Sequence, residues 1–154
     1  MMLKSLILGL ILSLPFTAIE LNPPEKNLTS KEVKCLADNI FYEAGNQSIE
    51  GKLAVAYVTW NRTKHQRFPN TVCGVIYQKN QFSWTTNSSY TKQHRPVKTD
   101  WRWVESLMVA NNFLLYPDPT HGALFFHEKT VKPEWKYKLI TRIQDHLFYK
   151  FSER

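Results

Sequence analysis

The sequence predicts an α+β fold, with a helical core followed by a small C-terminal antiparallel β-sheet. Up to about residue 115, apolar residues recur at the spacing of amphipathic helices. After residue 122 the chain changes to short aromatic and β-branched runs separated by turn residues, which is the pattern of strands. With 154 residues the chain can form one domain with a sizeable hydrophobic core. Helices followed by strands in separate parts of one domain define the α+β class.

The first helix has the clearest signals. Thr29 and Glu32 have the spacing of a capping box, so the helix is predicted to begin there and to end near Gly45. Its apolar residues recur at helical spacing and predict the buried face: Val33, Leu36, Ala37, Ile40 and Ala44.

Three further helices are predicted. Ser48 is expected to cap a helix that runs to about His65, and Asn70 or Thr71 a short one that ends near Gln78. Asp100 is expected to cap the last one, over about residues 101–115. Its buried stripe is predicted to be Trp101, Val104, Met108 and Leu115. The polar stretch 79–99 is predicted to be a long loop that borders the functional site.

The strands are predicted over residues 123–127, 137–143 and 146–151. Gln144 and Asp145 separate the last two runs, which predicts a hairpin.

The N-terminal segment predicts export. Residues 1–19 carry one early Lys and an apolar run over 6–19, as in a secretory signal peptide, but the run lacks a clean cleavage site and could instead be retained as a membrane anchor. Residues 20–32 are expected to be a linker and the start of the domain, which occupies 33–154.

The charge balance is basic, with a net charge of +7. Nucleic acid, anionic lipid or an acidic polymer could each attract such a surface, although solubility alone would also explain it. The Lys and Arg residues are scattered and no nucleic-acid-binding motif is present, so we expect no nucleic-acid partner. In an exported protein, the cell wall is the partner that fits.

Cys35 and Cys73 are the only cysteines. An even pair in an exported chain predicts a disulfide, with two buried free thiols as the alternative. Neither has a second Cys or a His at ligand spacing, so no metal site and no cofactor are expected.

Glu43 is the candidate catalytic residue. It lies in the last turn of the first helix, at the margin of the apolar stripe. Burial disfavours the charged carboxylate, so its pKa should rise towards the working pH, as a general acid requires. The alternative is an ordinary solvated residue near a helix end.

Four ordered motifs surround this glutamate: residues 43–62, 68–76 and 81–84, and then 122–127 with Pro133, Trp135 and a closing 146–149. Together they resemble the SleB/CwlJ family of cell-wall hydrolases, over about residues 33–150. The chain departs from the family pattern at positions 45–47, where Gly-Asn-Gln stands in place of Arg-Gly-Glu. The resemblance implies a lysozyme-like fold related to lytic transglycosylases, peptidoglycan as substrate and Glu43 as the acid.

Glycosidases usually employ two carboxyl groups. Asp38 points elsewhere on its helix, and Glu50 is better placed to stabilise the start of the next helix. A single Glu43 would suffice for lytic transglycosylation, in which the muramic C6 hydroxyl closes onto C1. A hydrolytic muramidase, a non-catalytic exported wall-binding module and a DNA-binding domain are the alternatives. We expect a monomer.

Five further residues are candidates for substrate binding: Gln81, Ser83, Trp84, His127 and Trp135. Gln81 and Ser83 could hydrogen-bond acetamido or hydroxyl groups, and the two Trp rings could stack on sugars. Each also has a structural alternative in loop bonding or core packing. Tyr42 is expected in the core.

Overall fold

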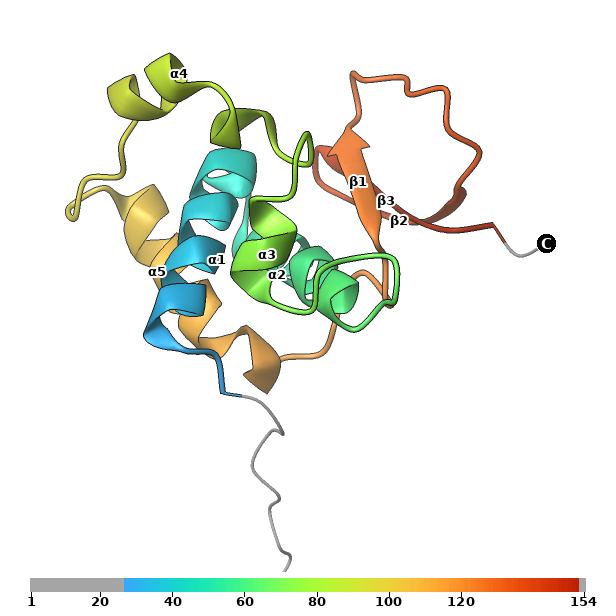
Figure 1. Cartoon of the computed structure of the whole chain (residues 1–154), viewed down its shortest axis with the longest axis horizontal. Helices are drawn as coiled ribbons and strands as arrows, with labels where there is room; N and C mark the ends of the chain where they lie inside the picture. The colour runs from blue at the N-terminus through green and yellow to red at the C-terminus, as the bar shows by residue number, and fades with distance from the viewer. Residues whose placement is uncertain (1–26, 153–154) are drawn as a thin grey trace, which may run out of the picture.

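The computed structural model of the protein describes residues 27–152 (Figure 1). Helices make up one half of the molecule and a three-stranded antiparallel sheet lies at the other side, so the predicted α+β class is confirmed. The predicted signal peptide or anchor and the first part of the linker lie outside the described residues. Within the described part, no helix is both long and apolar enough to cross a membrane.

Helix α1 (Ser30–Ala44) is the central element and packs against α2, α3 and α5. It begins as predicted, because the Thr29 side chain accepts a hydrogen bond from the Glu32 backbone N–H and the Glu32 side chain accepts one in return. The predicted stripe is confirmed: Leu36, Ala37, Ile40 and Ala44 are buried, and Val33 packs against them.

Helix α2 (Ile49–Thr63) and the short helix α3 (Val72–Ile76) begin after Ser48 and Thr71, whose side chains accept hydrogen bonds from backbone N–H groups. The predicted disulfide between Cys35 and Cys73 is confirmed, with their Cα atoms 5.5 Å apart. It joins α1 to α3 across a sequence separation of 38 residues. In the chain-entropy model a loop of this length stabilises the fold by about 4 kcal/mol.

The prediction of a long loop over residues 79–99 was wrong in part. The segment contains a 3₁₀ turn, η1 (Ser83–Thr85), and a helix, α4 (Ser88–Gln93), which Asn87 caps. Helix α4 buries none of its residues, so it has no apolar stripe that sequence periodicity could detect.

Helix α5 (Trp101–Asn112) begins at Asp100 as predicted and continues into the 3₁₀ turn η2 (Phe113–Leu115). The predicted buried stripe was wrong, because Trp101, Val104, Met108 and Leu115 are all exposed. The helix instead buries Ser106, Val109 and Ala110, and Phe113 of η2 is buried after it. The small buried residues Ser106 and Ala110 allow α5 to pack closely on α1. Because apolar residues lie on both faces of α5, the hydrophobic periodicity of the sequence did not indicate which face is buried.

The sheet contains β1 (Phe125–Glu128), β2 (Lys138–Ile143) and β3 (His146–Lys150), in the order β1-β3-β2. The hairpin between β2 and β3 is confirmed, and Gln144 adopts a positive φ of 50° in its turn. One face of the sheet packs on α2 through Ile143 and Phe148. The other face carries aromatic rings, including Phe125 and Tyr149, which lie against the connection between β1 and β2.

The turn between α1 and α2 is fastened to this hairpin. The Ser48 backbone N–H donates to Gln144 Oε1 at 2.7 Å, and Gln47 Nε2 donates to Asp145 Oδ2 at 3.3 Å. A Cβ at Gly51 would lie 2.8 Å from Gln47 Cβ, so this close approach requires glycine. Gln47 is one of the residues that depart from the family pattern, and a glutamate there would face the Asp145 carboxylate.

The buried Lys52 side chain also holds the turn between α1 and α2. Its side chain is fully buried, donates to the Gln47 carbonyl oxygen at 2.6 Å and pairs with Glu105 of α5 at 2.9 Å. A buried ammonium is tolerated because it has both a charged partner and a hydrogen bond. The backbone that follows Glu43 is therefore held by α2, α5 and the hairpin together.

Candidate active site

A cleft of about 760 Å³ lies between the C-terminal end of α1, the segment 80–90 and the strands β1 and β3. Its walls carry polar and aromatic side chains, with Glu43 among them. The residues that line it include Tyr42, Glu43, Arg62, Gln81, Phe82, Ser83, Trp84, Tyr90, Phe126, His127, Glu128 and His146. Segments far apart in the sequence thus meet at one surface.

A second hollow of about 380 Å³ lies beside it, lined by α4, the segment after it and the start of α5. Tyr42, Glu43 and Tyr90 line both hollows. Glu43 therefore lies where the two meet, with space for an extended ligand on either side.

Burial controls the protonation of Glu43. Desolvation at the end of α1 raises its pKa to about 7, against the opposing effect of the positive charge of Arg62. The prediction of a raised pKa at the margin of the apolar stripe agrees with this. At neutral pH the side chain is therefore present both as acid and as carboxylate.

Arg62, the last residue of the motif that begins at Glu43, is a charged side chain that the sequence analysis did not consider. It is only 5% exposed, and its Nε donates to the Leu124 carbonyl oxygen at 2.7 Å while Nη1 donates to Gln81 Oε1 at 3.1 Å. Its guanidinium lies 5.2–5.7 Å from the ring centroids of Phe68, Phe82 and Phe125. Burial lowers its pKa to about 10, so it stays charged at neutral pH.

Three of the predicted substrate-binding residues come from the segment after α3, and all three line the cleft. Ser83 is exposed there. The Gln81 side-chain oxygen is already engaged by Arg62. Trp84 is 6% exposed, donates from Nε1 to Asn39 Oδ1 at 3.1 Å and stacks on Tyr42, so its ring belongs to the core beneath the cleft.

The other two lie on the sheet. His127 lines the cleft, but its Nε2 is 2.8 Å from the Tyr149 hydroxyl and its Nδ1 is 2.7 Å from the Glu128 carbonyl oxygen. Both ring nitrogens thus have protein partners. Trp135 packs against His127 and Tyr149 on the aromatic face of the sheet, and it is not among the residues that line the cleft.

Besides Arg62, sequence reasoning missed Tyr90 and Glu128 as cleft residues, and it did not assign Tyr42 to the cleft. Tyr42 was expected in the core; it is half-buried and packs against the core, but it also lines both hollows. Glu128 stands at the end of β1 and brings a second carboxyl group to the cleft. The only available signal was its place directly after the motif that ends at His127.

The other carboxylates near α1 have local partners. Asp100 caps α5 and pairs with Arg102, whose hydrogen bonds hold the pKa of that carboxyl below its ordinary value. Asp38 pairs with Lys34 at 2.7 Å. Glu50 lies exposed in the first turn of α2, as predicted. Within residues 27–152, no group of three or more His, Cys, Asp or Glu side chains is arranged to hold a metal ion.

Comparisons with known proteins agree on one family. The family model described as cell wall hydrolase matches residues 46–149, a span that begins three residues after Glu43. The chain is 28% identical to the spore cortex-lytic enzyme of Bacillus cereus over 145 residues, which is 87% of this chain and 52% of that protein. It is also 28% identical to the spore cortex-lytic enzyme of Bacillus subtilis over 134 residues, 85% of this chain and 41% of that protein.

Two solved structures share the fold. The catalytic domain of the germination-specific lytic transglycosylase SleB from Bacillus anthracis superposes with a TM-score of 0.68 and 24% identity, over 83% of this chain and all of that one. The catalytic domain of Bacillus cereus SleB gives 0.63 and 25%, over 82% and 94%. The fold is thus the lysozyme-like fold of SleB catalytic domains, and the chain spans about half the length of the curated relatives it matches. Since the family model covers more than half of the chain, the protein belongs to the cell wall hydrolase family.

Proposed function

We propose that this protein cuts peptidoglycan glycan strands at the β-1,4 bond between N-acetylmuramic acid and N-acetylglucosamine, as a lytic transglycosylase with Glu43 as the sole acid/base. One observation carries the proposal: a carboxyl group with a pKa of about 7 lies where two hollows meet. A glycan strand is an extended ligand that could occupy both hollows and place one linkage at Glu43. The names of the relatives point to the same polymer.

The reaction needs one proton donor that can take a proton back. Protonated Glu43 gives its proton to the bridging oxygen, and the bond from that oxygen to C1 of the muramic residue breaks. The Glu43 carboxylate then accepts the proton of the C6 hydroxyl while O6 forms a bond to C1. The glutamate returns to its starting state, and no water is consumed.

The positive charge of Arg62 keeps both protonation states of Glu43 accessible during this reaction. Burial favours protonated Glu43, whereas the fixed positive charge of Arg62 favours the carboxylate that forms after proton donation. Gln81 would act through Arg62, because its side-chain oxygen accepts a hydrogen bond from the guanidinium. We therefore assign both as positioning residues.

Other side chains would contact the glycan. The Tyr90 ring is 43% exposed and lines both hollows, so it is better placed than Trp84 or Trp135 to stack on a sugar ring. The exposed Ser83 is available to hydrogen-bond an acetamido or hydroxyl group. His127 would offer its ring surface, since both ring nitrogens already have protein partners.

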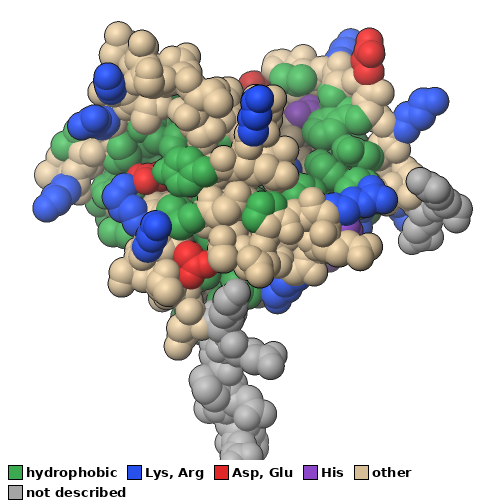
Figure 2. Space-filling model, viewed as in Figure 1, with side chains coloured by type: hydrophobic (Ala, Val, Ile, Leu, Met, Phe, Trp, Pro, Cys, Tyr) green, Lys and Arg blue, Asp and Glu red, His purple; other side chains and the backbone are tan. Residues whose placement is uncertain are grey.

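Action on the wall requires export, which residues 1–19 would direct. On the face seen in Figure 2, Lys and Arg side chains are scattered and not gathered into one stripe. A scattered basic surface suits an extended anionic polymer such as peptidoglycan. We propose that the enzyme works there as a monomer.

A hydrolytic muramidase is the second candidate, and Glu128 favours it. This exposed carboxyl group lines the same cleft as Glu43 and could activate a water molecule. The outcome depends on whether water or the C6 hydroxyl reaches C1.

The first prediction concerns catalysis. Glu43→Gln keeps the shape of the side chain and removes its proton, so release of soluble fragments from purified sacculi should fall by at least about a hundredfold. Glu50→Gln, in the exposed first turn of α2, is the matched control and should retain near wild-type activity. If folded Glu43→Gln protein solubilises sacculi at the wild-type rate, the proposed mechanism is wrong. Wild-type protein that binds sacculi without releasing fragments would point to a wall-binding module.

The second prediction concerns pH. Above about pH 7 the acid form of Glu43 should decline, and with it the rate, by about tenfold per pH unit. Arg62→Met removes the charge that lowers the pKa of Glu43, so this decline should begin at a higher pH. Arg62→Lys retains a positive charge and should stay closer to the wild-type profile. Initial rates over pH 5–9, for variants checked by thermal unfolding, measure this; identical profiles for all three proteins would contradict it.

The third prediction concerns stability. Between pH 4.5 and about 7 the unfolded chain ionises Glu43 while the folded protein keeps it protonated, so the folded state loses stability as pH rises. The loss ends above about pH 7 and amounts to about 3 kcal/mol. Gln cannot ionise, so the stability of Glu43→Gln relative to wild type should increase by about this amount from pH 4 to pH 8. Denaturant unfolding at both pH values tests it, and an unchanged difference would contradict it.

The fourth prediction separates the two candidate reactions. Lytic transglycosylation leaves a 1,6-anhydro end on the muramic residue, whereas hydrolysis leaves a reducing end. Mass spectrometry of digested sacculi should show anhydro ends, and Glu128→Gln should change the rate by less than about tenfold. Reducing ends, together with a loss of activity in Glu128→Gln comparable to that in Glu43→Gln, would assign the protein as a muramidase.

A further inference from the structure

The outer face of α5 is an exposed apolar surface, on which the Trp101 ring has a partner, the Lys52 ammonium 5.3 Å from its ring centroid. By the outer face of α5 we mean six exposed side chains on α5, on η2 and on the residue after η2: Trp101, Val104, Leu107, Met108, Leu115 and Tyr116. They make up half of the exposed large hydrophobic residues in the described part of the chain. Contiguous apolar surface of this kind marks an interaction site more often than scattered single residues do.

The charged residues of α5, Arg102 and Glu105, are half-buried, and each has an ion-pair partner, Asp100 and Lys52 respectively. Asn111 and Asn112 are the other exposed residues of this helix, and their side-chain amides donate to the Leu107 and Met108 carbonyl oxygens, each at 2.8 Å. Their N–H groups are therefore already partly satisfied by the helix itself. Trp101 and Tyr116 stand at the two ends of the strip, and rings with one polar group are enriched where protein meets lipid headgroups.

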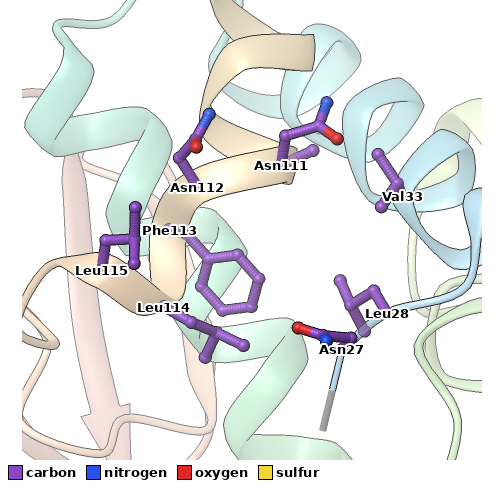
Figure 3. A pocket seen from close by; sticks show the side chains of 9 residues that line it. Asn27, Leu28, Val33, Asn111, Asn112, Phe113, Leu114 and Leu115 are labelled. Carbon is purple, nitrogen blue, oxygen red and sulfur yellow. The ribbon is translucent and has the colours of Figure 1, made fainter. Parts of the chain in front are cut away.

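The face continues into a hollow where the described chain begins. A cavity of about 270 Å³ is lined by Asn27 and Leu28 on one side and by residues 110–115 on the other. Figure 3 shows Leu28 and Val33 across from Phe113 and Leu114, with Asn111 close by. Asn27, the first described residue, thus lies beside the C-terminal end of the outer face.

The apolar run 6–19 ends eight residues before Asn27, which an extended chain spans in at most about 27 Å. If that run is retained in a membrane, the outer face is kept close to the bilayer. The net charge of +7 favours an anionic lipid surface. A second copy is less well supported, because six exposed side chains are far fewer than the roughly 20–30 residues that each partner contributes to a standard interface.

We propose that the outer face of α5 rests on the surface of an anionic lipid bilayer to which residues 6–19 tether the chain. The six side chains enter the headgroup region, with Trp101 and Tyr116 at the ends of the contact. None of them lines the cleft, so the glycan site stays open while the face is covered. The proposal concerns where the protein is held, and it does not depend on the glycan-cleaving activity.

Tryptophan fluorescence can test this on the full 154-residue chain, added to phosphatidylethanolamine–phosphatidylglycerol vesicles with brominated acyl chains. Trp101 is 57% exposed on the outer face, whereas Trp60 and Trp84 are each 6% exposed and Trp103 and Trp135 are half-buried and not part of that face, so bromine should quench mainly Trp101. We expect a loss of about one fifth of the emission, because the chain has five Trp residues. The loss should disappear in Trp101→Phe and weaken in the double variant Val104→Gln/Met108→Gln.

Leu139→Gln is the matched control, since Leu139 is 52% exposed on β2 and lies outside the outer face. It should be quenched like the wild type. All variants should float with vesicles, because each keeps residues 6–19, and their thermal unfolding should match. Equal quenching in the wild type and Trp101→Phe, or in the wild type and the double variant, would overturn the proposal. A dimer that protects residues 101–116 from hydrogen exchange without vesicles would also overturn it and assign the face to a second copy.

Discussion

A buried positive charge organises the half of the molecule that contains the cleft. An arginine inside a protein must keep its hydrogen bonds, because leaving a buried charge without partners is strongly destabilising. The Arg62 guanidinium meets this requirement with the Leu124 carbonyl oxygen and the Gln81 side chain. Leu124 directly precedes β1, and Gln81 lies at the start of the segment 80–90, which forms the opposite wall of the cleft. The hydrogen bonds of the Arg62 side chain therefore connect α2 to the sheet and to the segment 80–90.

Glu43 draws its chemical character from the same arrangement. The end of α1 places its carboxyl where water is partly excluded, which favours the protonated form, and Arg62 limits how far this goes. A carboxyl in water would be ionised at neutral pH, and one beside a closer cation would be ionised more firmly still. Desolvation thus raises the pKa of Glu43, and the positive charge of Arg62 limits the rise to about 7. The turn after it is held by buried Lys52, so the acid sits on a rigid support.

Two surfaces of the protein have different physical character, and α1 lies between them. The cleft at its C-terminal end is polar and aromatic, which suits sugars that offer both hydroxyl groups and C–H faces. The outer face of α5 is formed by apolar side chains, and it ends beside the start of α1. Such a division fits an enzyme held at one boundary while acting on a polymer next to it.

The sequence by itself determined what depends on neighbours along the chain: the caps of α1, α2, α3 and α5, the stripe of α1 and the hairpin of the sheet. It also selected Glu43 as the candidate acid, because a motif and a helix margin are both local. Only the tertiary structure decided which face of α5 is buried, since apolar residues lie on both sides of that helix. Tertiary packing also determines that Glu128 and Arg62 line the cleft and that Trp135 does not. A contact between distant segments depends on how elements approach in space, which no local periodicity records.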